Sequence, residues 1–305
     1  MFSALVNQLI VIFLYVLIGF VANKAKVIDE RLQNGLSSVV MTIVIPCSII
    51  ASANKPMEPS NLSAIVIIFL GGALYHIFAM ISLEGITKFL PISKKQKAVF
   101  SCLSIFPNVG FIGYPIMSVF LPENGIFFAS FYLVTFYLGF FTYGVFKLSD
   151  IKKFSLKTVF TNINILACIL MVVLYVLQIK FPTPVQSAIQ NIGSMSSSLS
   201  MIVVGSMLAN NRIRGLFSNL LLYLSSLLRL IIFPTIMFVI LLFLPFPHEV
   251  EIVLLVMTGL PTATLTALAA ETYNCEPEFA SNGAIQSVLL FAITVFYLTF
   301  LVTFL

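Results

Sequence analysis

The chain has 305 residues, of which 60% are hydrophobic and only 9% are charged, and its formal net charge is +5. A soluble domain of this length carries about 25% charged residues, so the composition excludes a soluble domain and predicts an integral membrane protein. The basic balance does not indicate nucleic acid as a partner, because the charges lie in short connections between apolar segments, where they set membrane orientation.

Ten apolar segments follow one another along the chain, and each has about the 20 residues that a helix needs to cross the lipid bilayer. They cover residues 3–23, 34–53, 61–83, 97–121, 124–147, 157–180, 186–210, 217–244, 249–273 and 278–303. Strands of a membrane barrel would be about half as long and would alternate in polarity, so we expect an all-α fold. The first segment lacks a preceding basic region and a cleavage site, which favours a retained span over a signal peptide.

Basic residues concentrate in the connections that follow odd-numbered segments. Thirteen of the 16 lie there, namely Lys24, Lys26, Arg31, Lys88, Lys94, Lys95, Lys97, Lys147, Lys152, Lys153, Lys157, Arg212 and Arg214. The other connections hold only Lys55 and Lys180. Because basic loops remain in the cytoplasm, this asymmetry predicts a multi-pass protein of the plasma membrane with both termini extracellular.

The longest connection, around residues 148–156, divides the segments into two groups of five. The predicted repeats are therefore residues 1–150 and 151–305. An odd number of spans in each half gives the halves opposite orientations, so related halves form an inverted repeat. A shift of 154 residues carries Pro107 onto Pro261, and both prolines interrupt the middle of an apolar segment.

The fourth segment contains an unusual cluster of helix breakers, FPNVGFIGYP, at residues 106–115. Pro107 lacks a donor and clashes with the preceding turn, and the glycines permit conformations closed to other residues. We expect a half-helix over 98–106, an extended crossing over 107–114, and a second half-helix that has Pro115 at its first position.

The ninth segment contains a matching interruption, TGLPTAT, at residues 258–264. The pattern predicts a break around 259–263, with Thr262 or Thr264 capping the helix that follows. Two opposed half-helix N-termini at the bilayer midplane would attract an anion, while the C-terminal ends would offer carbonyls to a cation. One proline alone is usually a kink, but two matched breaks favour a binding site. The candidate substrate-binding residues are Pro107, Asn108, Gly110, Gly113, Tyr114, Pro115, Gly259, Pro261, Thr262, Thr264, Thr266 and Arg229.

Arg229 lies near the middle of the eighth segment, where an arginine costs at least about 2.5 kcal/mol unless it faces protein or water. Two interpretations remain open: the side chain pairs with a substrate carboxylate, or it binds carbonyls exposed by Pro234. Tyr75 is its counterpart at the shift of 154. Neighbouring His76 is a candidate proton-coupling residue, although a neutral histidine hydrogen-bonded between helices is the more common case.

Asn108 is the strongest single ligand candidate, because an amide beside a helix break donates to a carboxylate and accepts from a cation. Asn282 and Gln286 lie one turn apart in the tenth segment and are candidates for ion coupling, with helix-to-helix hydrogen bonds as the alternative. No acidic residue falls at a midspan, and the four cysteines have no CxxC spacing. No catalytic or metal motif is visible either, so neither an enzyme, a cofactor nor a metal site is predicted.

These motifs resemble those of the auxin efflux carrier family. PNVGFIGYPIM resembles the family's N-x-G-F-x-G-x-P pattern, RLIIFP resembles its R-L-x-x-x-P, and GLPTATLTALAAETYNCEPEFAS resembles its P-x-A-x-N pattern and the A-x-x-Y and A-S elements that follow. The resemblance covers the whole chain and extends to the ten segments. The family includes plant PIN-type carriers and bacterial malate or malonate permeases. The short central connection of this chain is similar to that of the bacterial members.

The resemblance implies a scaffold of spans 1, 2, 6 and 7 and a transport domain of spans 3–5 and 8–10. It also implies crossed helices, elevator-type movement, and assembly as a homodimer. One position departs from the family pattern, because Leu265 stands where many members have asparagine. Only one crossover asparagine, Asn108, is therefore present.

The sequence thus predicts a secondary active transporter of small organic anions, mono- or dicarboxylates, in the lipid bilayer. Its drive would be the membrane potential or coupling to H⁺ or Na⁺. One alternative is a sodium-coupled symporter like the bile-acid carriers, which share the inverted-repeat crossover. A second alternative is a transporter-like receptor that binds a ligand without moving it.

Overall fold

The computed structural model describes residues 2–149, 161–210, 216 and 219–305. In these residues the secondary structure is helical, apart from one isolated antiparallel bridge between Pro107 and Thr262. Several predicted features lie outside the described residues: the repeat boundary at 150/151, the start of the sixth segment at 157, and Lys152, Lys153, Lys157, Arg212 and Arg214.

The chain forms two compact units. Unit 1 comprises Met1–Val66, Gly110–Phe131 and Phe160–Asn211, and unit 2 comprises Ile67–Val109, Tyr132–Val159 and Arg212–Leu305. Two α-helices contribute to both units, α4 (Pro59–Lys88) and α7 (Gly125–Gly139). Each unit therefore combines parts of the chain that are far apart in sequence.

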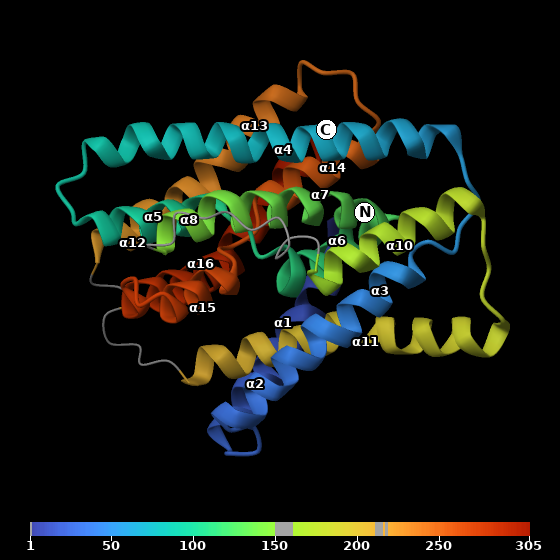
Figure 1. The fold of residues 1–305 in the computed structure, drawn as a ribbon, viewed down its shortest axis with the longest axis horizontal. Coiled ribbons are helices and arrows are strands. Elements are labelled where there is room, and N and C mark those ends of the chain that lie inside the picture. Colours follow the sequence, from blue (N-terminus) through green and yellow to red (C-terminus); the bar gives the residue numbers. More distant parts are fainter. Residues whose placement is uncertain (1, 150–160, 211–215, 217–218) are drawn as a thin grey trace. The chain divides into compact units, whose positions relative to one another are not determined.

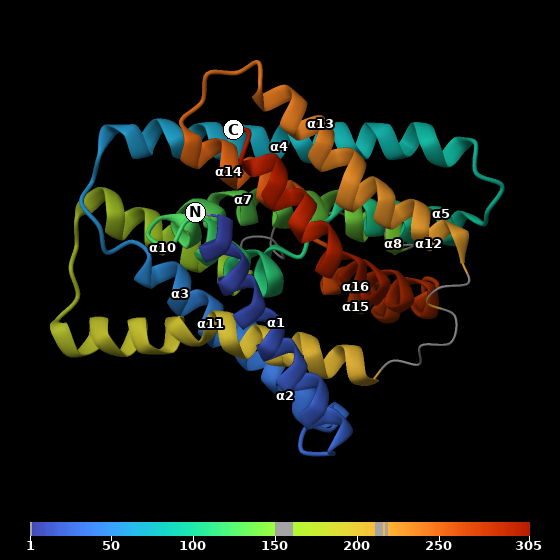
Figure 2. The same cartoon turned by 180° about the vertical axis from the view of Figure 1, so that it is seen from behind.

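The other helices of unit 1 are α1 (Phe2–Lys24), α2 (Glu30–Val39), the π-helical turn η1 (Val40–Val44), α3 (Ile45–Ala51), α6 (Tyr114–Phe120), α10 (Ile163–Leu177) and α11 (Thr183–Asn210). Within this unit, α1 and α3 both pack against α11, and the ribbon views show α1 crossing α11 obliquely (Figures 1 and 2). Glycines allow the close approach, because a Cβ atom on Gly205 would lie 1.9 Å from Val16 O and one on Gly193 would lie 2.9 Å from Ser48 Cα.

The other helices of unit 2 are α5 (Lys94–Ile105), η3 (Phe140–Gly144), α8 (Val145–Leu148), α12 (Leu220–Leu227), η4 (Leu228–Ile232), α13 (Phe233–Leu241), α14 (His248–Thr258), α15 (Thr264–Thr272) and α16 (Pro277–Val302). The π-helical turn η2 (Val109–Gly113) begins in unit 2 and ends in unit 1. In unit 2, α16 packs on α12, α14, α15 and α5, so it forms a centre for this unit.

Six helical stretches of the described residues are long and apolar enough to cross a membrane. These are Glu30–Ala51, Asn61–Lys88, Gly125–Leu148, Thr183–Ala209, Leu220–Leu241 and Pro277–Val302. Shorter apolar helices occupy Leu9–Lys24, Val109–Phe120 and Ile163–Leu177. The all-helical membrane fold is confirmed, whereas ten spans arranged as an inverted repeat of five and five remain a prediction.

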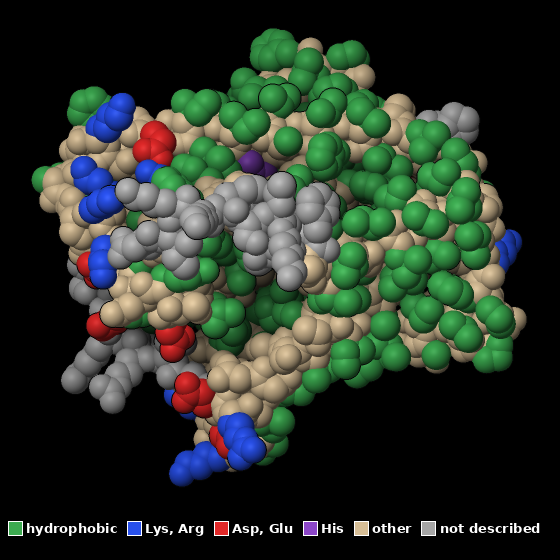
Figure 3. Space-filling view, in the orientation of Figure 1, with side chains coloured by type: hydrophobic (Ala, Val, Ile, Leu, Met, Phe, Trp, Pro, Cys, Tyr) green, Lys and Arg blue, Asp and Glu red, His purple; other side chains and the backbone are tan. Residues whose placement is uncertain are grey.

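Helix α4 carries an outward stripe of large apolar side chains. Val66, Leu70, Leu74, Ile77 and Ile81 follow one another at intervals of three or four residues, and each exposes more than half of its surface. The space-filling view shows hydrophobic side chains along this helix (Figure 3). Such a stripe would be unfavourable in water and is typical of a helix in a membrane protein.

Prolines follow directly after π-helical turns in three of these helical stretches. Pro46, Pro115 and Pro234 are each the second residue of the α-helix that follows η1, η2 and η4, respectively. A proline lacks an N–H group and crowds the carbonyl four residues earlier, and the wider π turn relieves this crowding. The helices therefore continue through these prolines without ending.

Candidate functional site: a helix crossover in unit 2

The two interruptions predicted at Pro107 and Pro261 meet in unit 2. The Asn108 N–H donates to Pro261 O at 2.7 Å, and the Ala263 N–H donates to Phe106 O at 2.9 Å. These bonds form the antiparallel bridge between Pro107 and Thr262. The polar backbone groups that the breaks release therefore satisfy one another in part, as backbone within a membrane requires.

The first break is shorter than the sequence predicts. Helix α5 ends at Ile105, and the chain is helical again from Val109, so the extended crossing expected over 107–114 is wrong beyond residue 108. Pro115 is the second residue of α6, close to the predicted first position, but the π-helical turn η2 precedes this α-helix. The π turn explains the difference, because it lets the helix resume before the proline.

The second break lies between the end of α14 at Thr258 and the start of α15 at Thr264. Gly259 caps α14, and a Cβ atom there would lie 2.7 Å from the Leu298 side chain. The N-cap of α15 is Ala263 and makes no side-chain capping bond, so the predicted threonine cap is wrong. The Thr262 hydroxyl instead donates to Leu103 O at 2.7 Å.

Ser287 is a crossover residue that sequence reasoning missed. Its hydroxyl accepts the Thr262 N–H at 2.9 Å, and its side chain is 1% exposed. The only sequence signal for this role is a hydroxyl beside Gln286 within an apolar segment.

The last four carbonyls of an α-helix have no N–H partner within the helix. In α5, all four of these carbonyls find partners outside it. Cys102 O accepts the Phe106 N–H, and Leu103 O accepts the Thr262 hydroxyl. Ser104 O and Ile105 O accept the Arg229 guanidinium at 3.5 and 2.6 Å, and the Tyr75 hydroxyl also donates to Ile105 O at 3.2 Å. The acceptors at this helix end are thus satisfied by the protein itself.

Arg229 also serves the end of α14. Its Nε donates to Leu260 O at 3.0 Å, and its Nη2 donates to Thr258 O. The side chain is fully buried, and Nη1 also donates to the Tyr75 hydroxyl, which lies 154 residues away in sequence. Of the two interpretations left open for Arg229, contact with carbonyls is the one observed, but these carbonyls belong to the two helix ends and not to the region of Pro234.

Donors at the start of α15 contrast with these satisfied acceptors. Among the described residues, the backbone N–H groups of Thr264 and Leu265 have no acceptor, whereas the Thr266 N–H donates to Ala263 O at 3.0 Å. The Thr266 side chain is fully buried, and its hydroxyl has no partner in the described part of the chain. A buried hydroxyl without a partner costs about 1–3 kcal/mol, so this position favours a ligand that accepts hydrogen bonds.

Asn108 is brought to this place by the bond between its backbone and Pro261, and its side chain is 3% exposed. Leu265 offers no polar side-chain atom, but its backbone N–H is one of the donors of the α15 N-terminus. The departure from the family pattern at this position therefore leaves the site with a donor.

Four other candidate residues fall in unit 1. Gly110 and Gly113 belong to η2, and the buried Tyr114 hydroxyl lies 3.2 Å from Ser130 Oγ. Pro115 lines a cavity of about 180 Å³. The other residues that line this cavity come from α1, α6 and α11 and include Tyr15, Ser118, Ser194, Ser197 and Ser198.

His76 lies in a buried aromatic cluster of unit 2, against the rings of Tyr75, Phe106 and Tyr132. Its Nδ1 is 2.7 Å from Gly72 O, so Nδ1 carries a proton, because a carbonyl only accepts. The Thr135 hydroxyl on α7 lies 3.5 Å from the same nitrogen. This geometry fits a packed, hydrogen-bonded histidine better than a group open to solvent.

The two candidate residues of the tenth segment, Asn282 and Gln286, differ in their contacts. The Gln286 side chain donates to Leu216 O at 2.8 Å and accepts from the Ser226 hydroxyl at 3.3 Å, so it joins helices, as the alternative interpretation expects. Asn282 is half-buried on the same helix. A role for either residue in ion coupling remains a prediction.

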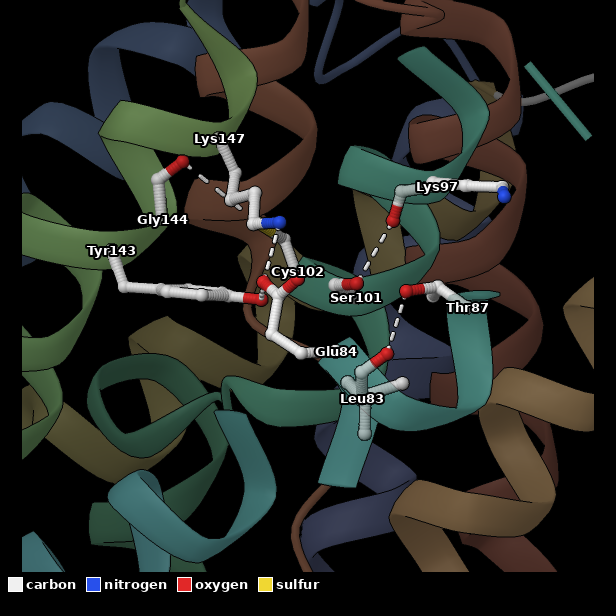
Figure 4. A network of polar contacts seen from close by, with 9 residues as sticks. All are labelled: Leu83, Glu84, Thr87, Lys97, Ser101, Cys102, Tyr143, Gly144 and Lys147. Atoms are coloured by element: carbon white, nitrogen blue, oxygen red, sulfur yellow. Dashed lines mark hydrogen bonds and ion pairs between the residues drawn. The ribbon is translucent and has the colours of Figure 1, made fainter. Parts of the chain in front are cut away.

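The acidic residue at the end of α4 is engaged in a network of its own (Figure 4). Glu84 Oε1 accepts a 2.7 Å bond from the Tyr143 hydroxyl and forms an ion pair with Lys147. The Glu84 side chain is 44% exposed. It is therefore no substitute for the buried midspan carboxylate that a crossed-helix antiporter would use.

Interrupted helices that meet inside an apolar, helical protein are characteristic of membrane transporters. A family model described as membrane transport protein matches residues 4–153 and 147–299. The chain therefore belongs to this family, the auxin efflux carrier family that its motifs resemble, and it is a multi-pass membrane transport protein. A search of curated proteins gave no match.

Proposed function

We propose that this protein is a secondary active transporter of small organic anions, either mono- or dicarboxylates, and that the crossover in unit 2 binds the carboxylate. The proposal includes ten spans in an inverted repeat, with both termini outside the plasma membrane. Two contacts support the repeat offset of 154 residues. Arg229 contacts its counterpart Tyr75 directly, and Pro107 pairs with Thr262, the residue that follows its counterpart Pro261.

One observation carries the choice of an anion: Arg229 satisfies carbonyls at both helix ends, whereas donors at the start of α15 have no acceptor in the described part of the chain. The carbonyls of Ser104, Ile105, Thr258 and Leu260 all accept from Arg229. The N–H groups of Thr264 and Leu265 and the Thr266 hydroxyl have no acceptor among the described residues. The positive end of the α15 dipole adds to this preference, since it is equivalent to roughly half an elementary charge.

In this proposal the carboxylate accepts from the Thr264 and Leu265 amides and from the Thr266 hydroxyl, and the Asn108 side-chain amide is a further donor. Arg229 does not touch the substrate, because its donors are directed to backbone oxygens. It holds the ends of α5 and α14 so that the amides of α15 stay in place.

The transport step is an elevator-type movement of one part of the protein against another, within a homodimer. The division into units supports a two-part protein, since α1, α3, α10 and α11 group in unit 1 while α5 and α12–α16 group in unit 2. The first group corresponds to the scaffold that the family resemblance implies.

Uptake of radiolabelled malate, malonate and indole acetate into proteoliposomes tests the proposal. Thr266→Val removes one donor to a charged group, worth about 1.5–3 kcal/mol, so we expect the apparent affinity to fall about 10- to 150-fold. Asn108→Ala is expected to weaken uptake as well, and Pro107→Ala is expected to impair it by changing the break.

Thr272→Val is the matched control, because it makes the same substitution at the exposed end of the same helix. It should leave uptake unchanged. Saturable uptake that is equal in wild type, Thr266→Val and Asn108→Ala would contradict the assignment of the site. Binding without any flux would support the receptor alternative instead of transport.

A further inference from the structure

We propose that Arg229 is a resident cation: its guanidinium occupies the cation site that the carboxyl ends of α5 and α14 create, so no metal cation binds there. The occupancy follows from the geometry alone. Its consequence, that transport needs no Na⁺ at this place, rests on the proposed function.

The carboxyl ends of the two interrupted helices form a site of the kind that takes a cation. Half-helix carboxyl ends and unwound carbonyls coordinate Na⁺ in transporters with broken helices, and rings of carbonyls replace the hydration shell of K⁺ in channels. In this protein the oxygens are those of Ser104, Ile105, Thr258 and Leu260, and each accepts from Arg229. The guanidinium therefore occupies the position in which these carbonyl oxygens would replace the hydration shell of a metal cation.

The charges at this point balance. Each helix end carries roughly half a negative charge, so two ends together are equivalent to about one, which a single guanidinium cancels. Arg229 is fully buried, and a buried charge is tolerated only when it is paired and hydrogen-bonded. Its contacts satisfy this condition, because donors on all three nitrogens reach oxygen atoms.

The fork of donors explains why arginine suits this place. A guanidinium presents five N–H groups in a fixed plane, whereas a lysine is a point charge with three donors. The Nε atom serves one helix end through Leu260, Nη2 serves it through Thr258, and Nη1 serves the other end through Ile105. The two helix ends are thus tied together by one side chain.

Removing the side chain should leave an empty carbonyl site that an external cation can enter. The experiment measures the midpoint of thermal unfolding of the purified Arg229→Gly protein in detergent at constant ionic strength, with chloride salts of Na⁺, guanidinium and tetramethylammonium. The last ion is too large for the site and controls for ionic strength. A ligand at ten times its dissociation constant stabilises the folded state by about 1.4 kcal/mol, which raises the midpoint by about 2 °C for a chain of this size.

We expect guanidinium, and to a lesser extent Na⁺, to raise the midpoint of Arg229→Gly by about this amount over tetramethylammonium. Ser287→Ala is the matched control, since it weakens the same crossover at Thr262 without removing a charge. It should show no preference among the salts. Arg31→Gly, which removes an exposed arginine, should show none either.

A cation response of Arg229→Gly no greater than that of Ser287→Ala would overturn the proposal. So would a preference for Na⁺ over tetramethylammonium that is as large in the wild type as in Arg229→Gly, because such a response would come from a cation site elsewhere. Arg229→Lys gives a further test, because it keeps the charge and should show no cation preference. None of these measurements uses a carboxylate, so their failure is distinct from a failure of the proposed anion site.

Discussion

Replacing Gly205 with alanine would place a methyl group against the backbone of α1 in unit 1. The added Cβ would lie 1.9 Å from Val16 O, although real Cβ atoms essentially never approach another atom within 3.0 Å. The helices would have to separate by about 1 Å, and a gap of that size forfeits a quarter to a half of each dispersion contact across the interface. Neither atom of the clash belongs to a flexible side chain, so rotation cannot relieve it.

Overpacking of this kind costs about 1–3 kcal/mol, and we take about 3 kcal/mol because the obstacle is backbone. The higher helix propensity of alanine returns about 1 kcal/mol, so the net loss of stability is expected to be about 2 kcal/mol. The assay is reversible unfolding in mixed micelles of dodecyl maltoside and SDS, followed by circular dichroism.

Gly35→Ala is the matched control, since no atom lies within 4 Å of its Cβ position. It should be neutral or stabilising by up to about 1 kcal/mol. Gly19→Ala places its Cβ 2.0 Å from Ile202 O on the same interface, so the double variant should lose less than the sum of the single losses. Equal stabilities of Gly205→Ala and Gly35→Ala would refute the close packing of α1 on α11.

Three further outcomes are expected. In thermal unfolding without ligand, Thr266→Val should be as stable as the wild type or slightly more stable, because it removes a buried hydroxyl that has no partner in the described part of the chain. A clear drop in the unfolding midpoint would contradict the hydrogen-bond assignment. Ser287→Ala should lower stability by about 1–3 kcal/mol and speed hydrogen exchange at the Thr262 amide, and unchanged exchange would show that this bond does not hold the crossover. A double-mutant cycle of Lys147→Met and Glu84→Gln should give a coupling free energy of at most about 1 kcal/mol that falls with added salt, since both side chains are partly exposed. A larger coupling that is insensitive to salt would contradict the description of this pair as a surface ion pair.

The sequence predicted the positions of the breaks well because proline and glycine act locally. Pro107 and Pro261 interrupt their segments as expected, and their equivalence at one offset predicted that the two breaks belong together. The lengths of the breaks were harder to predict, since the π turn at Val109–Gly113 depends on how the chain accommodates Pro115.

The hydrogen bonds of the site depend on contacts between distant residues, which local patterns do not reveal. A threonine after a break is a good capping residue, but the Thr262 hydroxyl finds Leu103 O, 159 residues away in sequence. Arg229 was recognisable as a buried charge, yet its partners are backbone oxygens, which every residue carries. The sequence therefore identified Arg229 as important and left its role undecided.

The most direct test of the central claim is an experimental density map of the purified protein with saturating malonate. We predict carboxylate density within about 3 Å of the Thr264 and Leu265 amides, next to the Thr266 hydroxyl and away from the Arg229 guanidinium. Carboxylate density on the guanidinium, or none at the start of α15, would contradict the claim that this helix end receives the anion.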